Sequence, residues 1–331
     1  MTAAPAQPAP GRLVDGIPVA ARLHIVTGKG GTGKTTVAAA LALALAEGGR
    51  RVLLVEVEGR QALAQLFDVP ALPYAEQHLA AAAGGGEVVG LAIDPEEALL
   101  EYLDMFYNMK RAAHLMRRMG AIDFVTTLAP GLRDVLLTGK LKERVMELRP
   151  DKSPLYDAVV LDGPPTGRIR QFLDATQEVA NLAKVGPLAK QSKGVIDLLH
   201  GPLTAVHLVA LLEEMPVQET IDAARELDDA GYRIGTVVVN RARRTLVPAG
   251  QEHPHEAELR RGLDAAGVDA ALTAPLARQM AEYATRQSLQ AGNASRLDSI
   301  AAARVELPEL NQPIGLGELN ELAEQFMTDD Q

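Results

Sequence analysis

The chain has 331 residues, 47% of them hydrophobic, which is enough for one large α/β domain with insertions or for two domains. It contains no cysteine, and this excludes disulfides, cysteine-ligated zinc and iron–sulfur clusters. The net charge of −10 argues against general nucleic-acid binding, and no run reaches the ~18 apolar residues that span a bilayer, so we expect a cytoplasmic protein that binds no nucleic acid and is not an integral membrane protein.

The N-terminal part of the chain leads into a glycine-rich loop. Residues 1–20 are rich in alanine and proline without the features of a signal peptide, and we predict a disordered tail there. A β-rich run at 22–27 and a long apolar helix at 36–46 flank the loop. The loop reads Gly28-Lys29-Gly30-Gly31-Thr32-Gly33-Lys34-Thr35-Thr36.

The spacing of this loop is that of a phosphate-binding loop between a strand and a helix. Its glycines let backbone N–H groups curl around phosphate oxygens at the helix N-terminus. Lys34 can reach the β and γ phosphates, and the Thr35 hydroxyl can bind Mg²⁺. The sequence therefore predicts ATP or ADP with Mg²⁺ as the ligand. Lys29 is not needed for this cradle and requires a separate explanation.

The rest of the chain alternates between strand and helix signals. Strands are predicted at 51–57, 158–162, 205–210, 234–240 and 304–307, with helices between them, notably at 216–230. After the strand at 51–57 we expect a helix and a break at Gly84–Gly86. This order predicts an α/β fold with a doubly wound, mostly parallel sheet.

Two segments, about 95–155 and 170–203, lack clear strands and are predicted to form a helical subdomain. It would be inserted into an ATPase domain that spans 21–325, with 326–331 as a short tail. Four methionines at helical spacing lie in the first segment: Met105, Met109, Met116 and Met119. We interpret this stripe either as packing within a subdomain core or subunit interface, or as a groove for a client.

Acidic residues follow two of the predicted strands. Asp162 ends an apolar strand beside the phosphate loop, where a carboxylate can hold Mg²⁺ through water. The segment Pro165-Thr166-Gly167 follows and is suited to a hinge that senses the γ-phosphate. Glu56 and Glu58 alternate with valines at the end of another strand, and one of them can orient the attacking water; solvated strand-end glutamates would give the same pattern.

Taken together, these motifs resemble the signature-lysine (deviant Walker A) class of P-loop ATPases, and within it the arsenical pump-driving and guided-entry (tail-anchored protein targeting) ATPases. The resemblance covers about 22–325 and is greatest to bacterial, especially actinobacterial, anion-transporting-ATPase-like members. The segments that carry it, besides the loop, are Ile93–Tyr102, Ala129–Asp134, Asp162–Gly167, Val238–Asn240 and Leu307–Pro308.

The resemblance implies roles for several residues. Lys29 would cross a dimer interface to the nucleotide of the partner. Asn240, with the adjoining Arg241, would lie at the adenine edge, and Pro308 would pack on the ring. The partner would be a second copy or a paralogous ATPase subunit, and a membrane-protein client is the candidate cargo of the helical subdomain.

The chain departs from the family pattern in ways that bear on function. Glu58-Gly59-Arg60 stands where the family's first switch has Asp-Pro-Ala, which suggests slow turnover. Without cysteine, neither arsenite capture by thiolates nor a zinc staple between subunits is available. We therefore expect an ATPase in which Glu58, Lys29 and Lys34 are the catalytic residues. The alternatives are a slow or inactive ATP-binding scaffold that pairs with a paralogue and, less favoured, a small-molecule kinase.

Overall fold

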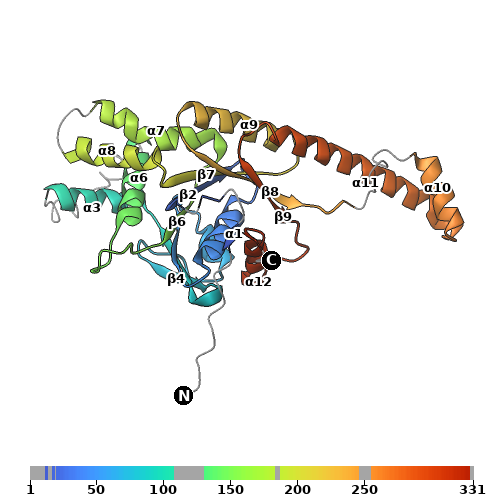
Figure 1. The fold of residues 1–331 in the computed structure, drawn as a ribbon, viewed down its shortest axis with the longest axis horizontal. Coiled ribbons are helices and arrows are strands. Elements are labelled where there is room, and N and C mark those ends of the chain that lie inside the picture. The colour runs from blue at the N-terminus through green and yellow to red at the C-terminus, as the bar shows by residue number, and fades with distance from the viewer. Residues whose placement is uncertain are drawn as a thin grey trace, which may run out of the picture.

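The computed structural model describes residues 12–13, 17–18, 20–107, 130–182, 187–245 and 255–328. A central eight-stranded sheet has helices on both faces (Figure 1). Its strand order is β4-β5-β3-β6-β2-β7-β8-β9, and β4 alone pairs antiparallel. The expected doubly wound α/β fold is confirmed.

The strands of this sheet are β2 Leu23–Gly28, β3 Arg51–Glu56, β4 Gln77–Ala81, β5 Glu87–Ala92, β6 Ala158–Asp162, β7 Thr204–Ala210, β8 Ile234–Ala242 and β9 Ala303–Pro308. The α-helices in the described residues are α1 Lys34–Ala46, α2 Ala62–Leu66, α3 Pro95–Tyr107, α6 Pro130–Met146, α7 Thr166–Leu182, α8 Pro187–Leu199, α9 Glu214–Asp229, α10 Glu256–Ala265, α11 Ala270–Leu297 and α12 Leu316–Glu324.

Two apolar cores lie on opposite faces of the sheet. Successive side chains of a strand point to opposite faces, so Ile25 and Val26 on β2 belong to different cores. Helix α1 is buried from Val37 to Ala46 and packs with α12 on one face. Helices α6, α7 and α9 supply side chains to the core on the other face. Burial on both faces explains why the central strands are continuously apolar.

Three parts of this fold differ from the sequence analysis. Strands β4 and β5, which surround the expected break at Gly84–Gly86, are not predicted. At the ends of the chain, expected to be tails, β1 (Arg12–Leu13) pairs antiparallel with β10 (Met327–Thr328). Residues 147–155, expected to be helical, instead form turns with a bridge between Leu148 and Pro154.

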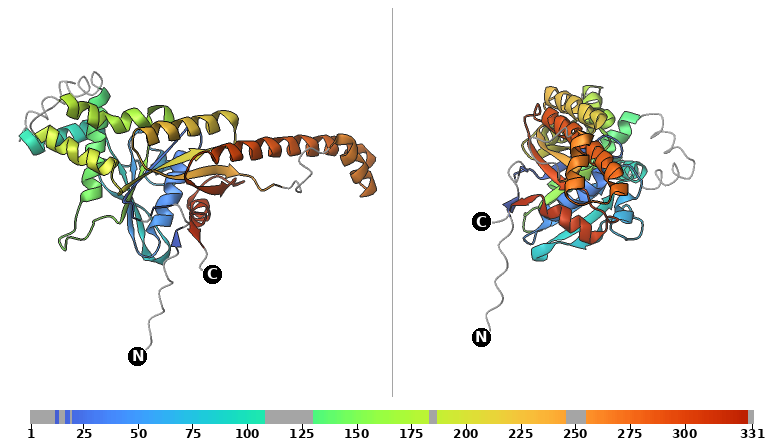
Figure 2. Two further views of the ribbon diagram at one scale, coloured as in Figure 1. Left: turned by 45° about the horizontal axis from the view of Figure 1, so that its top comes forward. Right: turned by 90° about the vertical axis from the view of Figure 1, so that its right-hand side faces the viewer.

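Helices α3, α6, α7 and α8 gather at one end of the molecule (Figures 1 and 2). They come from the two segments predicted as a helical subdomain. The methionine stripe cannot be placed on them, because Met109, Met116 and Met119 and the side chain of Met105 lie outside the described residues.

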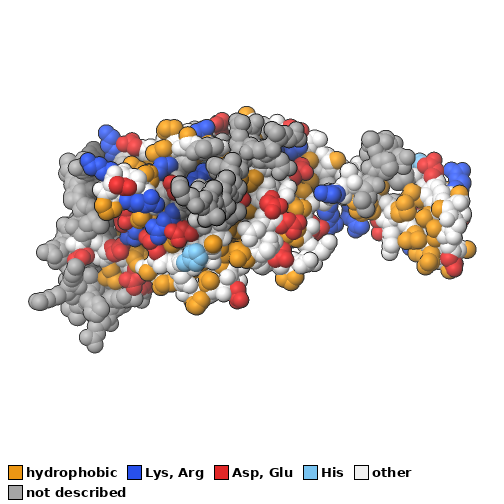
Figure 3. Space-filling model, turned by 60° about the horizontal axis from the view of Figure 1, so that its bottom comes forward, with side chains coloured by type: hydrophobic (Ala, Val, Ile, Leu, Met, Phe, Trp, Pro, Cys, Tyr) orange, Lys and Arg blue, Asp and Glu red, His pale blue; other side chains and the backbone are white. Residues whose placement is uncertain are grey.

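At the opposite end, α10 and α11 form a helical hairpin that projects from the body, which we call the arm (Figures 1 and 2). Helix α11 has 28 residues, and Asp269 caps its N-terminus through a hydrogen bond from the backbone N–H of Ala271. The large exposed apolar side chains of α11 are Leu272, Met280 and Leu289, and apolar side chains gather near the tip of the arm in Figure 3. No helix within the described ranges, α11 included, is long and apolar enough to cross a membrane.

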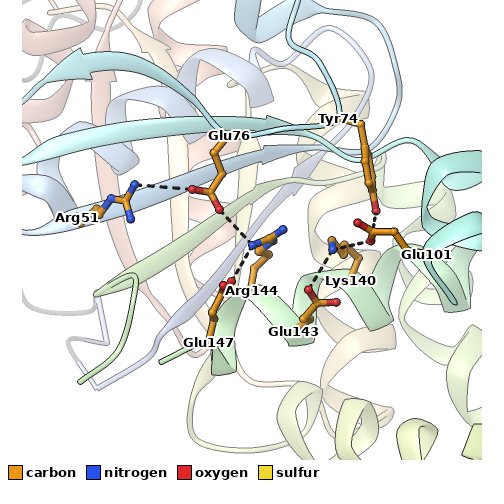
Figure 4. A network of polar contacts seen from close by, with 8 residues as sticks. All are labelled: Arg51, Tyr74, Glu76, Glu101, Lys140, Glu143, Arg144 and Glu147. Atoms are coloured by element: carbon orange, nitrogen blue, oxygen red, sulfur yellow. Dashed lines mark hydrogen bonds and ion pairs between the residues drawn. The ribbon is translucent and has the colours of Figure 1, made fainter. Parts of the chain in front are cut away.

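A polar network joins the helical end of the molecule to the sheet (Figure 4). Arg144 on α6 pairs with Glu76, which also lies 3.7 Å from Arg51 on β3. Lys140, one turn earlier on α6, is almost fully buried and pairs with Glu101 on α3 and with Glu143. The members of the network are Arg51, Tyr74, Glu76, Glu101, Lys140, Glu143, Arg144 and Glu147.

This network predicts that burial decides which ion pairs stabilise the helical end. Lys140→Met keeps the volume of the side chain but removes its charge, and we expect it to lower the free energy of unfolding by about 1–2 kcal/mol. The matched change Arg170→Met breaks the exposed pair with Asp174 on α7, and we expect a loss below about 0.5 kcal/mol. Urea unfolding of both variants tests this; equal losses would contradict it.

Candidate active site

The chemistry-bearing residues gather at the carboxyl edge of the sheet. Parallel strands place their C-terminal ends at one edge, where α/β proteins bind ligands. Strand β6 lies between β2 and β3, so that Asp162 is in register with Val26 on one side and Glu56 on the other. The phosphate loop therefore opens beside the two acidic strand ends that the sequence analysis singled out.

The glycines of the loop occupy positions that exclude a side chain. A Cβ at Gly28 would lie 2.4 Å from the carbonyl oxygen of Val209 on β7. Gly31 and Gly33 both have φ of +87°, which favours glycine. A Cβ at Gly33 would also lie 2.4 Å from Nδ2 of Asn240. Close packing of the loop against β7 and β8, together with its backbone conformation, explains these glycines.

At the start of α1, the loop brings together the groups expected to hold phosphate and Mg²⁺. The hydroxyl of Thr35 donates a 2.6 Å hydrogen bond to Oδ2 of Asp162. The other carboxylate oxygen, Oδ1, is buried and has no hydrogen-bond partner in the structure. A hydroxyl and a carboxylate oxygen are ligands that Mg²⁺ accepts, and the unpartnered oxygen leaves coordination capacity, so these residues fit the ion. Lys34 and Thr36, on either side of Thr35, also belong to the first turn of α1.

Burial shifts the pKa of both ionisable groups here, Asp162 and Lys34. It raises the pKa of Asp162 to about 6, although the Thr35 hydrogen bond and nearby Lys34 act in the opposite direction. Burial also lowers the pKa of Lys34, against the attraction of Asp162 and Glu58. A partly buried cation and a buried carboxylate beside a helix N-terminus form a site suited to a phosphate anion with a divalent cation.

Glu56 and Glu58, which the sequence leaves as alternatives, differ in their surroundings. Glu56 is 2% exposed and its carboxylate accepts hydrogen bonds from the backbone N–H groups of Gln61 and Leu63 at the start of α2. Glu58 lies beyond the strand, 3.5 Å from Arg60, with 22% of its side chain exposed. Glu58 is therefore the more exposed of the two carboxylates, and its role in orienting a water molecule stays a prediction.

The segment after Asp162 is tied to the neighbouring strand and opens α7. Gly163 donates its N–H to the carbonyl of Val26, and the hydroxyl of Thr27 donates to the carbonyl of Pro164 at 2.7 Å. Pro165 accepts hydrogen bonds from the backbone at the start of α7, which begins at Thr166 and Gly167. This segment is thus a direct connection between the carboxyl edge and a helix of the far end.

Helix α6 contacts both segments that border the phosphate site. Arg133 donates to the carbonyl of Val57, next to Glu58, at 3.4 Å. Asp134, which is 3% exposed, lies 3.9 Å from the guanidinium of Arg168 on α7. The pKa of Asp134 is raised, mainly by burial. Through these two contacts the start of α6 lies against both segments. The sequence analysis included Arg133 only within the Ala129–Asp134 segment, without a role, and did not identify Arg168.

The ends of β8 and β9 border two open hollows. Asn240 and Arg241 line one of about 850 Å³, and Pro308 lines the other of about 730 Å³. An ion pair between Arg243 and Glu309 lies on the rim of both. In this structure the side chain of Asn240 donates to the carbonyl of Thr32 at 2.8 Å and accepts from the N–H of Arg241. The adenine roles of Asn240, Arg241 and Pro308 stay predictions.

The C-terminal half of α11, which we call the root of the arm, forms one wall of the hollow that Asn240 and Arg241 line. Arg286, Leu289 and Asn293 on α11 line it, and Asn293 donates to the carbonyl of Leu212 at 3.3 Å. No motif in the sequence indicates this placement, because it depends on how α11 returns to the sheet from the tip of the arm.

Lys29 points away from the phosphate cradle. Its carbonyl accepts a 2.8 Å hydrogen bond from the hydroxyl of Thr32, while its ammonium lies 2.7 Å from a carboxylate oxygen of Glu219 on α9. The two lysines of the loop therefore diverge, with Lys34 directed toward the site and Lys29 toward α9. Glu219 is a further residue that the sequence analysis missed.

Comparisons with known proteins agree with this geometry. Residues 21–203 match the family model described as anion-transporting ATPase. The chain is 55% identical over 311 residues to the ATPase BagA of Mycobacterium tuberculosis, which covers 92% of each chain. It is 29% identical over 248 residues to an arsenical pump-driving ATPase of Escherichia coli, covering 68% of this chain and 40% of the relative. An arsenical pump-driving ATPase of Acidiphilium multivorum is also 29% identical, over 234 residues, covering 65% of this chain and 38% of the relative.

The glycine geometry predicts a difference between two positions of the loop. We expect Gly33→Ala to lower the free energy of unfolding by about 1–3 kcal/mol, because the methyl group requires strained backbone and displaces Asn240. Gly30→Ala meets no atom within 4 Å, and its expected effect is below about 0.5 kcal/mol. Denaturant unfolding without ligand measures both. Equal effects would show that the loop relaxes around the added methyl group.

The raised pKa of Asp162 predicts that its ionised form destabilises the ligand-free fold. Since the folded pKa of about 6 exceeds the usual 3.8, stability falls as pH rises through this range and stays reduced above it. Asp162→Asn removes the charge, and at pH 8 we expect it to raise the free energy of unfolding by up to about 3 kcal/mol.

The same substitution should eliminate the thermal stabilisation that we expect Mg-ATP to give the wild-type protein, because the carboxylate expected to hold Mg²⁺ is gone. Thermal melts with and without Mg-ATP supply both readouts. A variant that melts below the wild-type protein and is still stabilised by Mg-ATP would contradict both assignments to Asp162.

Proposed function

The chain belongs to the anion-transporting ATPase family, and from that membership we propose that it binds and hydrolyses Mg-ATP in a dimer whose nucleotide state controls its helical end. The observation that carries this proposal is the contact between Thr35 and Asp162 at the start of α1. It unites the phosphate loop with the acidic strand end at the place where Mg²⁺ and the terminal phosphates would lie.

In this proposal the residues of the site divide the work of phosphoryl transfer to water. The loop N–H groups and Lys34 bind the phosphates, and Thr35 and Asp162 hold Mg²⁺, which neutralises charge on the phosphate oxygens. Glu58 orients the attacking water. Lys29 reaches the nucleotide of a partner subunit, a second copy or a paralogue, and adds positive charge there.

The coupling to the helical end is supported by two contacts. Arg133 bonds to the backbone beside Glu58, and Asp134 approaches Arg168, just after the segment that follows Asp162. Arg133 and Asp134 are neighbours near the start of α6. A change at the γ-phosphate would thus be passed to the helices expected to bind a client, a membrane-protein segment being the candidate.

An ATP-binding scaffold without turnover is the second candidate function. Its support is Glu58, which has one methylene more than aspartate and lies beside Arg60. A longer side chain paired with a cation holds a water less rigidly, and positioning accounts for much of the rate in phosphoryl transfer.

Lysine substitutions separate binding from dimerisation. We expect Lys34→Ala to weaken ATP binding at least about tenfold, because it removes a charged contact to the phosphates. Lys29→Met should leave ATP affinity of the single subunit within about twofold and abolish ATP-dependent dimers. Equilibrium binding of a fluorescent ATP analogue and sedimentation velocity measure the two effects. The proposal fails if Lys29→Met dimerises like the wild-type protein.

Phosphate release by the purified chain decides between enzyme and scaffold. The ATPase proposal predicts steady turnover that falls at least about 10²-fold in Glu58→Gln while ATP affinity is kept. Gln65→Ala, at an exposed position of the nearby helix α2, is the control and should retain most of the activity. Turnover at background level in the wild-type chain, with ATP binding intact, would favour the scaffold.

A further inference from the structure

The ion pair between Lys29 and Glu219 uses the lysine for which the phosphate cradle has no role. The two charged atoms lie 2.7 Å apart within one subunit, from the loop after β2 to α9. Lys29 is 31% exposed and Glu219 is 38% exposed, so both side chains have solvent-accessible alternatives. The contact is therefore close but open to competition.

Both ends of this contact are fixed by backbone structure. The carbonyl of Lys29 accepts from Thr32, whose side chain is buried within the loop. Helix α9 is held by the buried side chains of Val217, Thr220 and Ile221, on residues that flank Glu219. Only the two side chains need to rotate for the pair to separate, while the loop and the helix stay in place.

Helix α9 carries several acidic residues, and Glu219 is the one that pairs with Lys29. Glu214 and Asp222 lie on the same helix, and Asp222 instead accepts a hydrogen bond from Gln218. The ammonium of Lys29 pairs with Glu219 and not with Asp222, although Asp222 lies only three residues further along the helix. The carboxylate of Glu219 therefore makes a contact with Lys29 that the carboxylate of Asp222 does not make.

We propose that Glu219 is a positioning residue that holds Lys29 within its own subunit until the triphosphate of a nucleotide on a second subunit competes for it. The inference rests on the proposed function, because it assumes that Lys29 acts across a subunit interface. The pair opposes closure, and the greater charge of a triphosphate makes closure depend on the nucleotide.

The size of the effect follows from the exposure of the pair. A partly exposed ion pair changes an equilibrium by roughly two- to fivefold. A symmetric dimer separates two such pairs, so the combined effect is roughly fourfold to 25-fold. Glu219 thus sets the concentration at which subunits associate, rather than deciding whether they associate.

The first test is the dissociation constant of the dimer formed by the full chain with Mg²⁺ and a non-hydrolysable ATP analogue, measured by sedimentation. We expect Glu219→Gln to lower this constant roughly fourfold to 25-fold. Asp222→Asn removes the same charge from the same helix and should change it less than about twofold. In a Lys29→Met background, which we expect to form no ATP-dependent dimer, adding Glu219→Gln should not restore association.

The outcomes of this test are distinct. An equal effect of Glu219→Gln and Asp222→Asn would show that the charge of α9 matters, and not the pair, and would overturn the proposal. Weaker association of Glu219→Gln would also overturn it, because Glu219 would then support the closed dimer.

The second test needs no dimer and so separates failure of this inference from failure of the proposed function. Acetylation of Lys29 by an amine-reactive reagent is followed by mass spectrometry in the nucleotide-free single subunit. We expect the rate to rise about two- to fivefold in Glu219→Gln and to be unchanged in Asp222→Asn. An unchanged rate in Glu219→Gln overturns the inference. If the acetylation rate rises but the chain never dimerises, the ion pair between Lys29 and Glu219 is supported and the proposed function in a dimer is refuted.

Discussion

The hydrogen bond between Thr35 and Asp162 is the contact on which the rest of the site depends. It joins the first turn of α1 to the end of β6, which is far away in sequence but is the neighbour in the sheet of β2, the strand that leads into the phosphate loop. Burial raises the pKa of Asp162, so the ionised carboxylate lowers the stability of the ligand-free fold. Such a cost is typical of a group retained for ligand binding. The bond also holds Asp162, and with it the start of the segment that follows, beside the phosphate loop.

From this point the connections lead in two directions. The segment from Gly163 to Thr166 opens α7, and α6 contacts both that region and the backbone beside Glu58. On the other side of the phosphate loop, Asn240 ties β8 to Thr32, and the root of the arm borders the same hollow. The phosphate site therefore lies between the helical end, to which it has covalent and hydrogen-bonded links, and the root of the arm, which lines a hollow together with Asn240.

Local chemistry explains what could be predicted from the sequence. The loop from Gly28 to Thr36 has a spacing that only phosphate binding requires, and the continuous apolar strands could come only from a sheet covered on both faces. The different surroundings of Glu56 and Glu58 could not be predicted, because the sequence does not show that β3 ends at Glu56, whose carboxylate binds the start of α2, and leaves Glu58 two residues beyond the strand. Strands β4 and β5 are obscured by glycines and alanines, whose strand propensity is low. The pairing of Lys29 with Glu219 joins residues 190 positions apart, and no local pattern reports it.

The central claim is that the nucleotide state of the phosphate site reaches the helical end through α6. Hydrogen–deuterium exchange of the full chain, with Mg²⁺ and either ADP or a non-hydrolysable ATP analogue, tests it most directly. The account predicts that the two nucleotides differ in the protection of residues 130–146 and 166–182 as well as in that of the phosphate loop. A difference confined to the loop and the strand ends, with both helices unchanged, would contradict it.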